Sequence, residues 1–228
     1  GTGPFHGEES SEMRQAFLDR MQVLLGTEYN SYLESMNDKP KRGLRINLLK
    51  TNESELQQLL PFPLVKTPFA RNSYVLPDDY SLKTSIAYAA GLFYVQEPSA
   101  SSAVSILAPE EDMNVLDLCA APGSKSTQIA EYLNGRGTLF CNEINRRRAE
   151  TLRENLEKEG VFNAIVLSAD PRDVAALLNH CMDAVLCDAP CSGEGMFRKN
   201  PEAAMEWTED SPASCAQRQG LILDSAYQ

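Results

Sequence analysis

The fold is decided by the stretch Val115-Leu-Asp-Leu-Cys119-Ala-Ala-Pro122-Gly-Ser-Lys125-Ser-Thr127. Its apolar start predicts a buried strand, the small residues a tight turn, and the segment from Lys125 a helix. The spacing fits neither G-x-x-x-x-G-K-[ST] nor G-x-G-x-x-G, so it predicts neither a P-loop nor the dinucleotide fingerprint. Such a turn still lets a ligand approach the backbone N–H groups at the helix start. An ordinary strand-to-helix turn is the alternative interpretation.

The segments after this stretch repeat the same unit. Strands are predicted at residues 115–119, 138–142, 164–169 and 184–187, with helices at 125–133, 146–159 and 173–179. Strands that alternate with helices at this spacing predict an α/β fold with a parallel, doubly wound sheet. A last helix is expected near residues 215–227.

The segment before this stretch has a different pattern. Helices are predicted at residues 11–25, 29–36 and 52–60, the last of them capped by Asn52. A basic-bordered strand is predicted at 41–50, and a strand or hairpin at 65–76. This mixture predicts a small α+β module over residues 1–80. Residues 81–113, with a strand at 92–97 and a helix at 99–107, are expected to connect it to the α/β domain at 114–228.

Composition limits the classes of protein that need to be considered. The chain has 228 residues, of which 43% are hydrophobic and 23% charged, as in ordinary globular proteins. No apolar run approaches the roughly 18 residues of a membrane helix, so no membrane partner is expected. Six Cys without a C-x-x-C pair, and only two His, argue against a metal site and for reduced, cytoplasmic thiols. A net charge of −11 means that nucleic-acid binding needs a local basic patch or further basic domains.

Acidic residues follow three of the predicted strands. Glu143 follows the second strand, Asp170 the third and Asp188 the fourth. Because parallel strands end at one edge of a sheet, these acids and the 119–125 turn predict a nucleoside site there. Glu143 lies about 20 residues past the turn, the offset at which an acid meets a ribose diol. Taken singly, Glu143 is equally a helix-start carboxylate, and Asp170 is better explained as a cap.

A thiol follows the fourth strand in Asp188-Ala-Pro-Cys191-Ser-Gly. Cys191 lies in a loop of small residues, where it is either a nucleophile or a thiol without a function. The thiols at 119, 141, 181 and 187 lie in or beside apolar runs and are expected to be inert.

Two groups of basic residues flank these motifs. Arg146-Arg-Arg148 opens a predicted helix and is expected to be a solvated face, although one Arg is able to brace a cofactor. Arg198 and Lys199 follow the Cys191 loop and are candidates for contacts with phosphates.

Two motifs together carry a family resemblance. Leu116-Asp-Leu-Cys-Ala-Ala-Pro-Gly-Ser-Lys125 with Asp188-Ala-Pro-Cys-Ser-Gly193 resembles the Nop/Sun family of RNA cytosine-5 methyltransferases, which use S-adenosylmethionine. Residues 193–201, Trp207 and Ala216-Gln-Arg-Gln219 resemble the bacterial members that act on 16S ribosomal RNA. Arg45-Ile-Asn47 and Tyr94-Val-Gln-Glu-Pro-Ser99 resemble upstream family segments, so the resemblance covers nearly the whole chain.

The resemblance implies that residues 1–80 are a module of an RNA-binding type. It also implies that residues 114–228 are a truncated catalytic domain, with a Rossmann-like class I methyltransferase sheet and a set of cofactor contacts. Ser124 stands where a second Gly is more usual, a change found among the bacterial members. Lys125 is also implied to support catalysis. The implied contacts with S-adenosylmethionine are Cys119, Ala120, Ala121, Pro122, Gly123, Ser124, Lys125, Glu143, Arg148, Asp170 and Asp188.

The resemblance also implies a mechanism with two thiols. A thiolate adds to C6 of cytosine and makes C5 nucleophilic, while Asp188 hydrogen bonds near N3. In this family the attacking Cys lies in a Thr-Cys pair after a fifth strand, and the thiol equivalent to Cys191 assists product release. Residues 1–228 contain no Thr-Cys pair, so the main nucleophile is expected beyond Gln228. Ending there would leave the fourth strand as an open edge, so a longer polypeptide is expected.

Two other functions remain open from the sequence. The first is a DNA cytosine-5 methyltransferase with Cys191 as nucleophile, although Ser-Gly follows Pro-Cys where that family has Gln. The second is a non-catalytic cofactor- and RNA-binding fragment. The leading hypothesis remains the RNA cytosine-5 methyltransferase, expected to be cytoplasmic and favoured as a monomer. Its expected partner is ribosomal RNA or a ribosomal subunit. The target cytosine must be unstacked before it reacts.

Overall fold

The computed structural model describes residues 8–197, 203–204 and 207–228. The chain divides into two compact units, which are described separately below. The larger unit consists of Lys41–Ala189 with Ile222–Gln228, and the smaller consists of Gly1–Pro40 with Pro190–Leu221. Both β-sheets belong to the larger unit.

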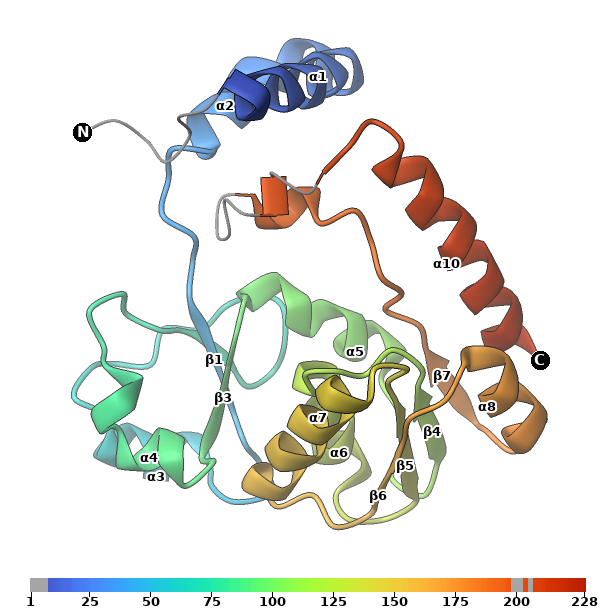
Figure 1. The fold of residues 1–228 in the computed structure, drawn as a ribbon. Helices are drawn as coiled ribbons and strands as arrows, with labels where there is room; N and C mark the ends of the chain where they lie inside the picture. Colours follow the sequence, from blue (N-terminus) through green and yellow to red (C-terminus); the bar gives the residue numbers. More distant parts are fainter. Residues whose placement is uncertain (1–7, 198–202, 205–206) are drawn as a thin grey trace. The chain divides into compact units, whose positions relative to one another are not determined.

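A four-stranded parallel sheet forms the centre of the larger unit (Figure 1). Its order is β6-β5-β4-β7, with strands β4 (Asn114–Asp117), β5 (Thr138–Asn142), β6 (Ala164–Leu167) and β7 (Ala184–Leu186). The connecting helices are α6 (Ser124–Leu133), α7 (Arg146–Glu159) and α8 (Pro171–Leu178). The prediction of a parallel α/β sheet is confirmed. Because every pair is parallel, all four strands end at one edge of the sheet.

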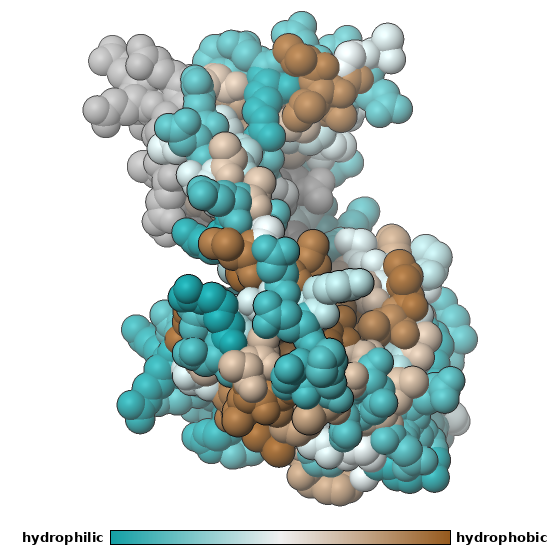
Figure 2. All heavy atoms as spheres, turned by 90° about the vertical axis from the view of Figure 1, so that its right-hand side faces the viewer, coloured by the Kyte–Doolittle hydropathy of each residue, from teal (hydrophilic) through white to brown (hydrophobic). Residues whose placement is uncertain are grey.

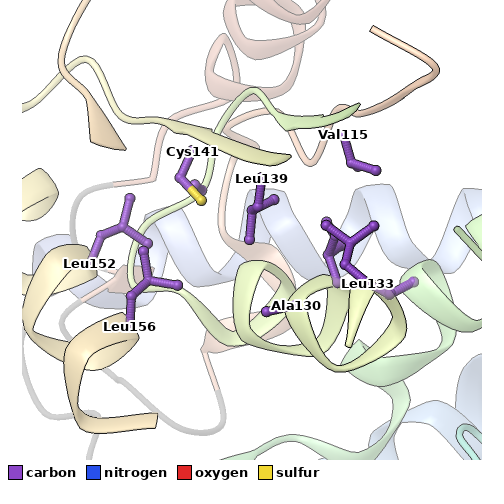
Figure 3. Packing of buried hydrophobic residues seen from close by; sticks show 10 residues of the cluster. Val115, Ala130, Leu133, Leu139, Cys141, Leu152 and Leu156 are labelled. Carbon is purple, nitrogen blue, oxygen red and sulfur yellow. The ribbon is translucent and has the colours of Figure 1, made fainter. Parts of the chain in front are cut away.

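The hydrophobic periodicity of these segments produces a common core (Figure 3). Leu139 and Cys141 on β5 are fully buried, and they share a cluster with Leu133 of α6 and Leu152 and Leu156 of α7. The last two are one helical turn apart and therefore lie on the same face of α7. Burial of such side chains stabilises the unit by about 1.5–3 kcal/mol each.

The element boundaries differ slightly from the predicted ones. Strands β4, β6 and β7 end one or two residues early, where the backbone turns into the loops at the carboxyl edge. Helix α8 begins at Pro171 because proline fits the first turn of a helix and Asp170 caps it. The last helix, α10 (Ser211–Tyr227), begins four residues before the predicted start.

A second sheet in the larger unit has three antiparallel strands in the order β2-β1-β3. They are β1 (Gly43–Ile46), β2 (Ser73–Val75) and β3 (Phe93–Gln96), accompanied by helices α3 (Glu53–Leu59), α4 (Ile86–Ala89) and α5 (Ser102–Leu107). Asn52 caps α3 as predicted, accepting a 3.0 Å hydrogen bond from the Glu55 N–H. The close approach of β3 requires Gly43, because a Cβ there would lie 2.9 Å from the Gln96 carbonyl oxygen. The domain boundaries at residues 80 and 113 stay predictions.

Strand β7 lies at an edge of the parallel sheet. Among the strands that the structure describes, it pairs with β4 alone. Its three residues are half-buried, whereas Val115, Leu116 and Asp117 on β4 are buried.

The smaller unit has its own aromatic cluster. Phe17 of helix α1 (Glu8–Leu25) packs edge-on against Phe197 and Trp207, with ring centroids 4.9 and 5.7 Å apart. This cluster ties the segment after the Cys191 loop to α1. Helix α2 (Tyr29–Ser35) and 3-10 helices at Gly26–Glu28 and Glu194–Met196 also belong to this unit; those at Leu82–Thr84 and Pro98–Ser101 belong to the larger one.

The surface of the chain is mixed in hydropathy. Figure 2 shows hydrophobic side chains in separate patches among hydrophilic ones on the face that it presents. No helix in the described part of the chain combines the length and the apolar character that crossing a membrane requires.

Candidate active site

The turn between β4 and α6 is a close-approach site for a ligand. Gly123 has φ 109°, a conformation that strains any L side chain, and an added Cβ would lie 3.1 Å from Leu152 Cδ1. The Ala120 N–H donates to the Asn142 carbonyl at 2.8 Å, which fixes the turn to the end of β5. Among the residues that the structure describes, no side chain caps α6 at Gly123, so its first backbone N–H groups are open to a ligand.

Asn142 holds three strand ends together, a function that the sequence did not reveal. Its side-chain amide donates to the Leu118 carbonyl at 3.3 Å and to the Ala169 carbonyl at 3.1 Å. Its Oδ1 accepts the Ala169 N–H at 3.1 Å. The only sequence indication was a polar residue that ends an apolar strand. Buried Asn142 therefore fixes the edge on which the site is built.

Glu143 and Arg148 form a linked pair beside the turn. The buried Glu143 carboxylate accepts the Asn145 N–H at 2.9 Å and pairs with Arg148 Nη1 at 3.1 Å. Arg148 Nη2 donates to the Ala121 carbonyl at 3.1 Å. The guanidinium therefore joins the end of β5 to the turn, although all three Arg residues are exposed. The exposed run fits the predicted solvated face, and the bracing of a cofactor by one Arg stays a prediction.

Lys125 and Asp188 join the end of β7 to the turn that follows β4. The Lys125 Nζ donates a 2.6 Å hydrogen bond to Asp188 Oδ2. Lys125 is in the first turn of α6, and Asp188 lies two residues beyond β7. The Asp188 side chain is 56% exposed, so it remains open to a substrate.

Asp170 caps helix α8, as the alternative interpretation held. Its Oδ1 accepts the Arg172 N–H at 3.0 Å and the Arg172 Nε–H at 2.9 Å. These hydrogen bonds from Arg172 hold the pKa of the Asp170 carboxyl below its usual range.

Asp117 is a buried acid beneath the turn that the sequence analysis did not single out. Its Oδ2 accepts a 2.7 Å hydrogen bond from Ser126 Oγ, while its Oδ1 has no partner among the described residues. Burial raises the pKa of Asp117 to about 6, against the opposing effects of Ser126 and Lys125. The available indication was a carboxylate inside an apolar strand.

The thiols near the turn are poor nucleophiles. Burial raises the pKa of Cys119 to about 12, and it also raises the pKa of Cys187. Both are therefore protonated at neutral pH. This agrees with the expectation that they are inert.

Cys191 lies in the smaller unit, where it is exposed and free. The Gln219 side chain donates to the Pro190 carbonyl at 3.0 Å, next to Cys191. Further along the loop, Glu194 accepts a 3.0 Å hydrogen bond from Trp207 Nε1 and pairs with Arg20. Arg198 and Lys199 lie outside the described residues.

The structure thus brings together most of the predicted site residues at one edge of the parallel sheet. These are the turn from Cys119 to Lys125 with Glu143, Arg148 and Asp188, and Asp170 at the neighbouring strand end. Cys191 is the predicted site residue that belongs to the other unit.

Solved structures share this fold. The crystal structure of PH0851 superposes with a TM-score of 0.87 at 27% identity, covering 99% of this chain and 54% of that one. A methyltransferase homologue from Pyrococcus horikoshii superposes with a TM-score of 0.80 at 25% identity, covering 97% of this chain and 72% of that one. The Rossmann-like methyltransferase fold that the resemblance implied is confirmed.

Sequence comparisons agree with the structural ones. The ribosomal RNA small subunit methyltransferase F of Erwinia tasmaniensis is 37% identical over 223 residues, covering 93% of this chain and 47% of the relative. The chain therefore spans about half the length of the curated relatives that it matches. Residues 13–98 match the N-terminal domain of 16S rRNA methyltransferase RsmF, and residues 104–228 match 16S rRNA methyltransferase RsmB/F. Because the second match covers more than half of the chain, the chain belongs to the 16S rRNA methyltransferase RsmB/F family.

Proposed function

We propose that the chain carries the cofactor site of an enzyme that transfers a methyl group from S-adenosylmethionine to C5 of a cytosine in 16S ribosomal RNA. The observation that carries the proposal is the open turn from Cys119 to Lys125, surrounded by polar strand ends. The family description names 16S rRNA, which supports RNA over DNA as the substrate.

The residues at the edge fit S-adenosylmethionine. Bound there, the cofactor supplies an electrophilic methyl group on a sulfonium. The left-handed Gly123 and the uncapped start of α6 allow the ligand to approach the backbone closely. Glu143 is held in place by Arg148 to accept hydrogen bonds from ribose hydroxyls. The unpartnered Asp117 Oδ1 adds negative potential beneath the turn, which favours a cationic donor.

Asp188 is proposed to hydrogen bond to the N3 edge of the target cytosine. A carboxyl group there that delivers a proton to N3 neutralises the negative charge that develops when a thiolate adds at C6. Lys125 holds Asp188 in position through their 2.6 Å contact. Asp170 is proposed as a further cofactor contact, in addition to capping α8.

Cys191 is proposed to assist product release, and the attacking thiol to come from outside residues 1–228. The exposed position of Cys191 is compatible with access to an RNA substrate. A ribosomal subunit as the physiological partner, a monomeric state and a cytoplasmic location stay part of the proposal.

Calorimetry with S-adenosylmethionine tests the cofactor site. Glu143→Gln is expected to weaken binding about tenfold, as loss of one charge-assisted hydrogen bond implies. Glu150→Gln, on the exposed face of α7, is the matched control and should bind like the parent chain. Absence of binding by the parent chain would overturn the proposed cofactor site.

A methyl-transfer assay tests the substrate. Labelled S-adenosylmethionine is incubated with 16S ribosomal RNA and either this chain or a version extended beyond residue 228. Nucleoside mass spectrometry should find 5-methylcytidine with the extended version. Product that is methylated at another position, or only on DNA, would contradict the proposed reaction.

A further inference from the structure

Arg45 on β1 is a fully buried cation with every donor nitrogen engaged. Its Nε pairs with Glu131 at 2.9 Å, and its Nη1 donates to Gln96 Oε1 at 2.9 Å. The same Nη1 donates to the Ser124 carbonyl at 2.6 Å, and Nη2 donates to Thr127 Oγ1 at 2.6 Å. A buried guanidinium is costly unless it is paired, and a buried ion pair is weak evidence for a purely stabilising function.

Two of these four hydrogen bonds end on the first turn of α6. Thr127 links Arg45 to a second residue of the turn, because its hydroxyl donates to the Gly123 carbonyl at 2.8 Å. Arg45 therefore contacts Ser124 directly and Gly123 through Thr127. Both residues belong to the turn proposed to hold the cofactor, and Lys125 follows immediately.

Arg45 also contacts α6 further along, at Glu131, and this contact leads back to the three-stranded sheet. Glu131, whose pKa burial raises, accepts a 2.6 Å hydrogen bond from Asn72 Nδ2 through its second oxygen. Asn72 Nδ2 also donates to the Ile46 carbonyl on β1 at 2.6 Å. Since the guanidinium is planar and rigid, its fork fixes the direction as well as the distance of these contacts. The network therefore fixes the start of α6 relative to β1.

We propose that Arg45 is a positioning residue for the cofactor turn. It holds the Gly123 and Ser124 carbonyls so that the backbone is pre-shaped for the ligand and Lys125 is directed to Asp188. Arg45 is buried and has no access to substrate, so it acts through Thr127 and Ser124. This inference rests on the proposed function, because it assigns the turn to S-adenosylmethionine.

Substitutions of Thr127 test the proposal without removing the buried charge. Thr127→Val keeps the shape of the side chain but removes the hydroxyl, whereas Thr127→Ser restores it. Calorimetry at a temperature where each variant is folded should show Thr127→Val binding S-adenosylmethionine about tenfold more weakly. Thr127→Ser should bind within about twofold of the parent chain. Leu44→Ala is the control for a loss of stability alone. Leu44 lies on β1 and packs in the hydrophobic core of the three-stranded sheet, so its substitution should lower the melting temperature and leave the dissociation constant unchanged.

A second variant and a second measurement keep the outcome decisive. If Thr127→Val fails to fold, the double variant Arg45→Met with Glu131→Met replaces the ion pair by apolar groups of similar volume. Amide hydrogen exchange at residues 119–127 should be faster in the positioning variants than in Leu44→Ala. An unchanged dissociation constant and unchanged exchange would overturn the proposal. If the parent chain does not bind S-adenosylmethionine, the proposed function fails, and exchange alone decides whether Arg45 orders the turn.

Discussion

The Lys125 ammonium donates a 2.6 Å hydrogen bond to the Asp188 carboxylate, which joins the start of α6 to the loop after β7. These residues are 63 positions apart in the chain, and each follows a strand of the parallel sheet. The proposed cofactor contact and the proposed cytosine contact are therefore coupled through one ion pair.

A double-mutant cycle on this pair should separate its effect on binding from its effect on stability. Lys125→Met and Asp188→Asn are each expected to weaken S-adenosylmethionine binding. The double variant should bind S-adenosylmethionine at least as tightly as whichever single variant has the lower affinity. The coupling in stability should be below about 1 kcal/mol, because the pair is partly exposed. Calorimetry and urea unfolding provide the two measurements.

The matched control for this cycle is another ion pair of the same length. Arg153 and Glu157 on the exposed face of α7 are also 2.6 Å apart. Substituting them should leave cofactor affinity unchanged. If both cycles give the same coupling in binding, Lys125 and Asp188 have no special function in the site.

Arg148→Met should weaken S-adenosylmethionine binding about tenfold, because the charge-assisted contacts to Glu143 and Ala121 are lost together. Arg147→Met removes the same charge one residue earlier from an exposed position. Its dissociation constant should match that of the parent chain. Equal weakening by both substitutions would mean that only the overall positive charge of this helix start matters.

Asp117→Asn should change the pH dependence of stability. Because the folded-state pKa of Asp117 is raised from 3.8 to about 6, the folded chain retains a proton that the unfolded chain releases between these values. This contribution to stability is present at low pH and is lost as the pH rises from about 4 to about 6. The variant should therefore gain about 2–3 kcal/mol relative to the parent chain between pH 4 and pH 7.5.

Urea unfolding at several pH values measures this difference. Asp173→Asn, on the exposed face of α8, is the control for removal of a carboxylate at the surface. A stability difference for Asp117→Asn that does not change between pH 4 and pH 7.5 would show that Asp117 titrates normally.

Alkylation should distinguish the thiols. At pH 8 a pKa of about 12 leaves about one Cys119 in ten thousand as thiolate, so iodoacetamide should modify it slowly. The exposed Cys181 and Cys191 should be modified first. Peptide mass spectrometry over time measures the order, and the Cys119 rate should rise about tenfold per pH unit. Modification of Cys119 as fast as Cys191 would contradict the buried, protonated state.

Local patterns in the sequence predicted most of the α/β sheet and much of the candidate site. Hydrophobic periodicity identified the strands and helices from Asn114 to Leu186, because these elements bury apolar faces at regular spacing. The side chain of Asn52 predicted the start of α3, since capping depends on residues only three positions apart. Glu143 and Asp188 were also predictable, because a parallel sheet gathers residues that follow its strands at one edge.

Other features depended on contacts between distant residues. Arg45 appeared in the sequence as part of a basic strand border and of a family-like segment, but the fold buries it against Glu131, 86 residues away. In the same way, Arg148 became distinct from Arg146 and Arg147 only where α7 faces the turn at Ala121. The sequence by itself thus determined which segments are strands and helices and which residues follow them, because periodicity and caps are local. Only the tertiary structure decided which charges are buried and paired, because desolvation and ion pairing depend on neighbours that packing brings together.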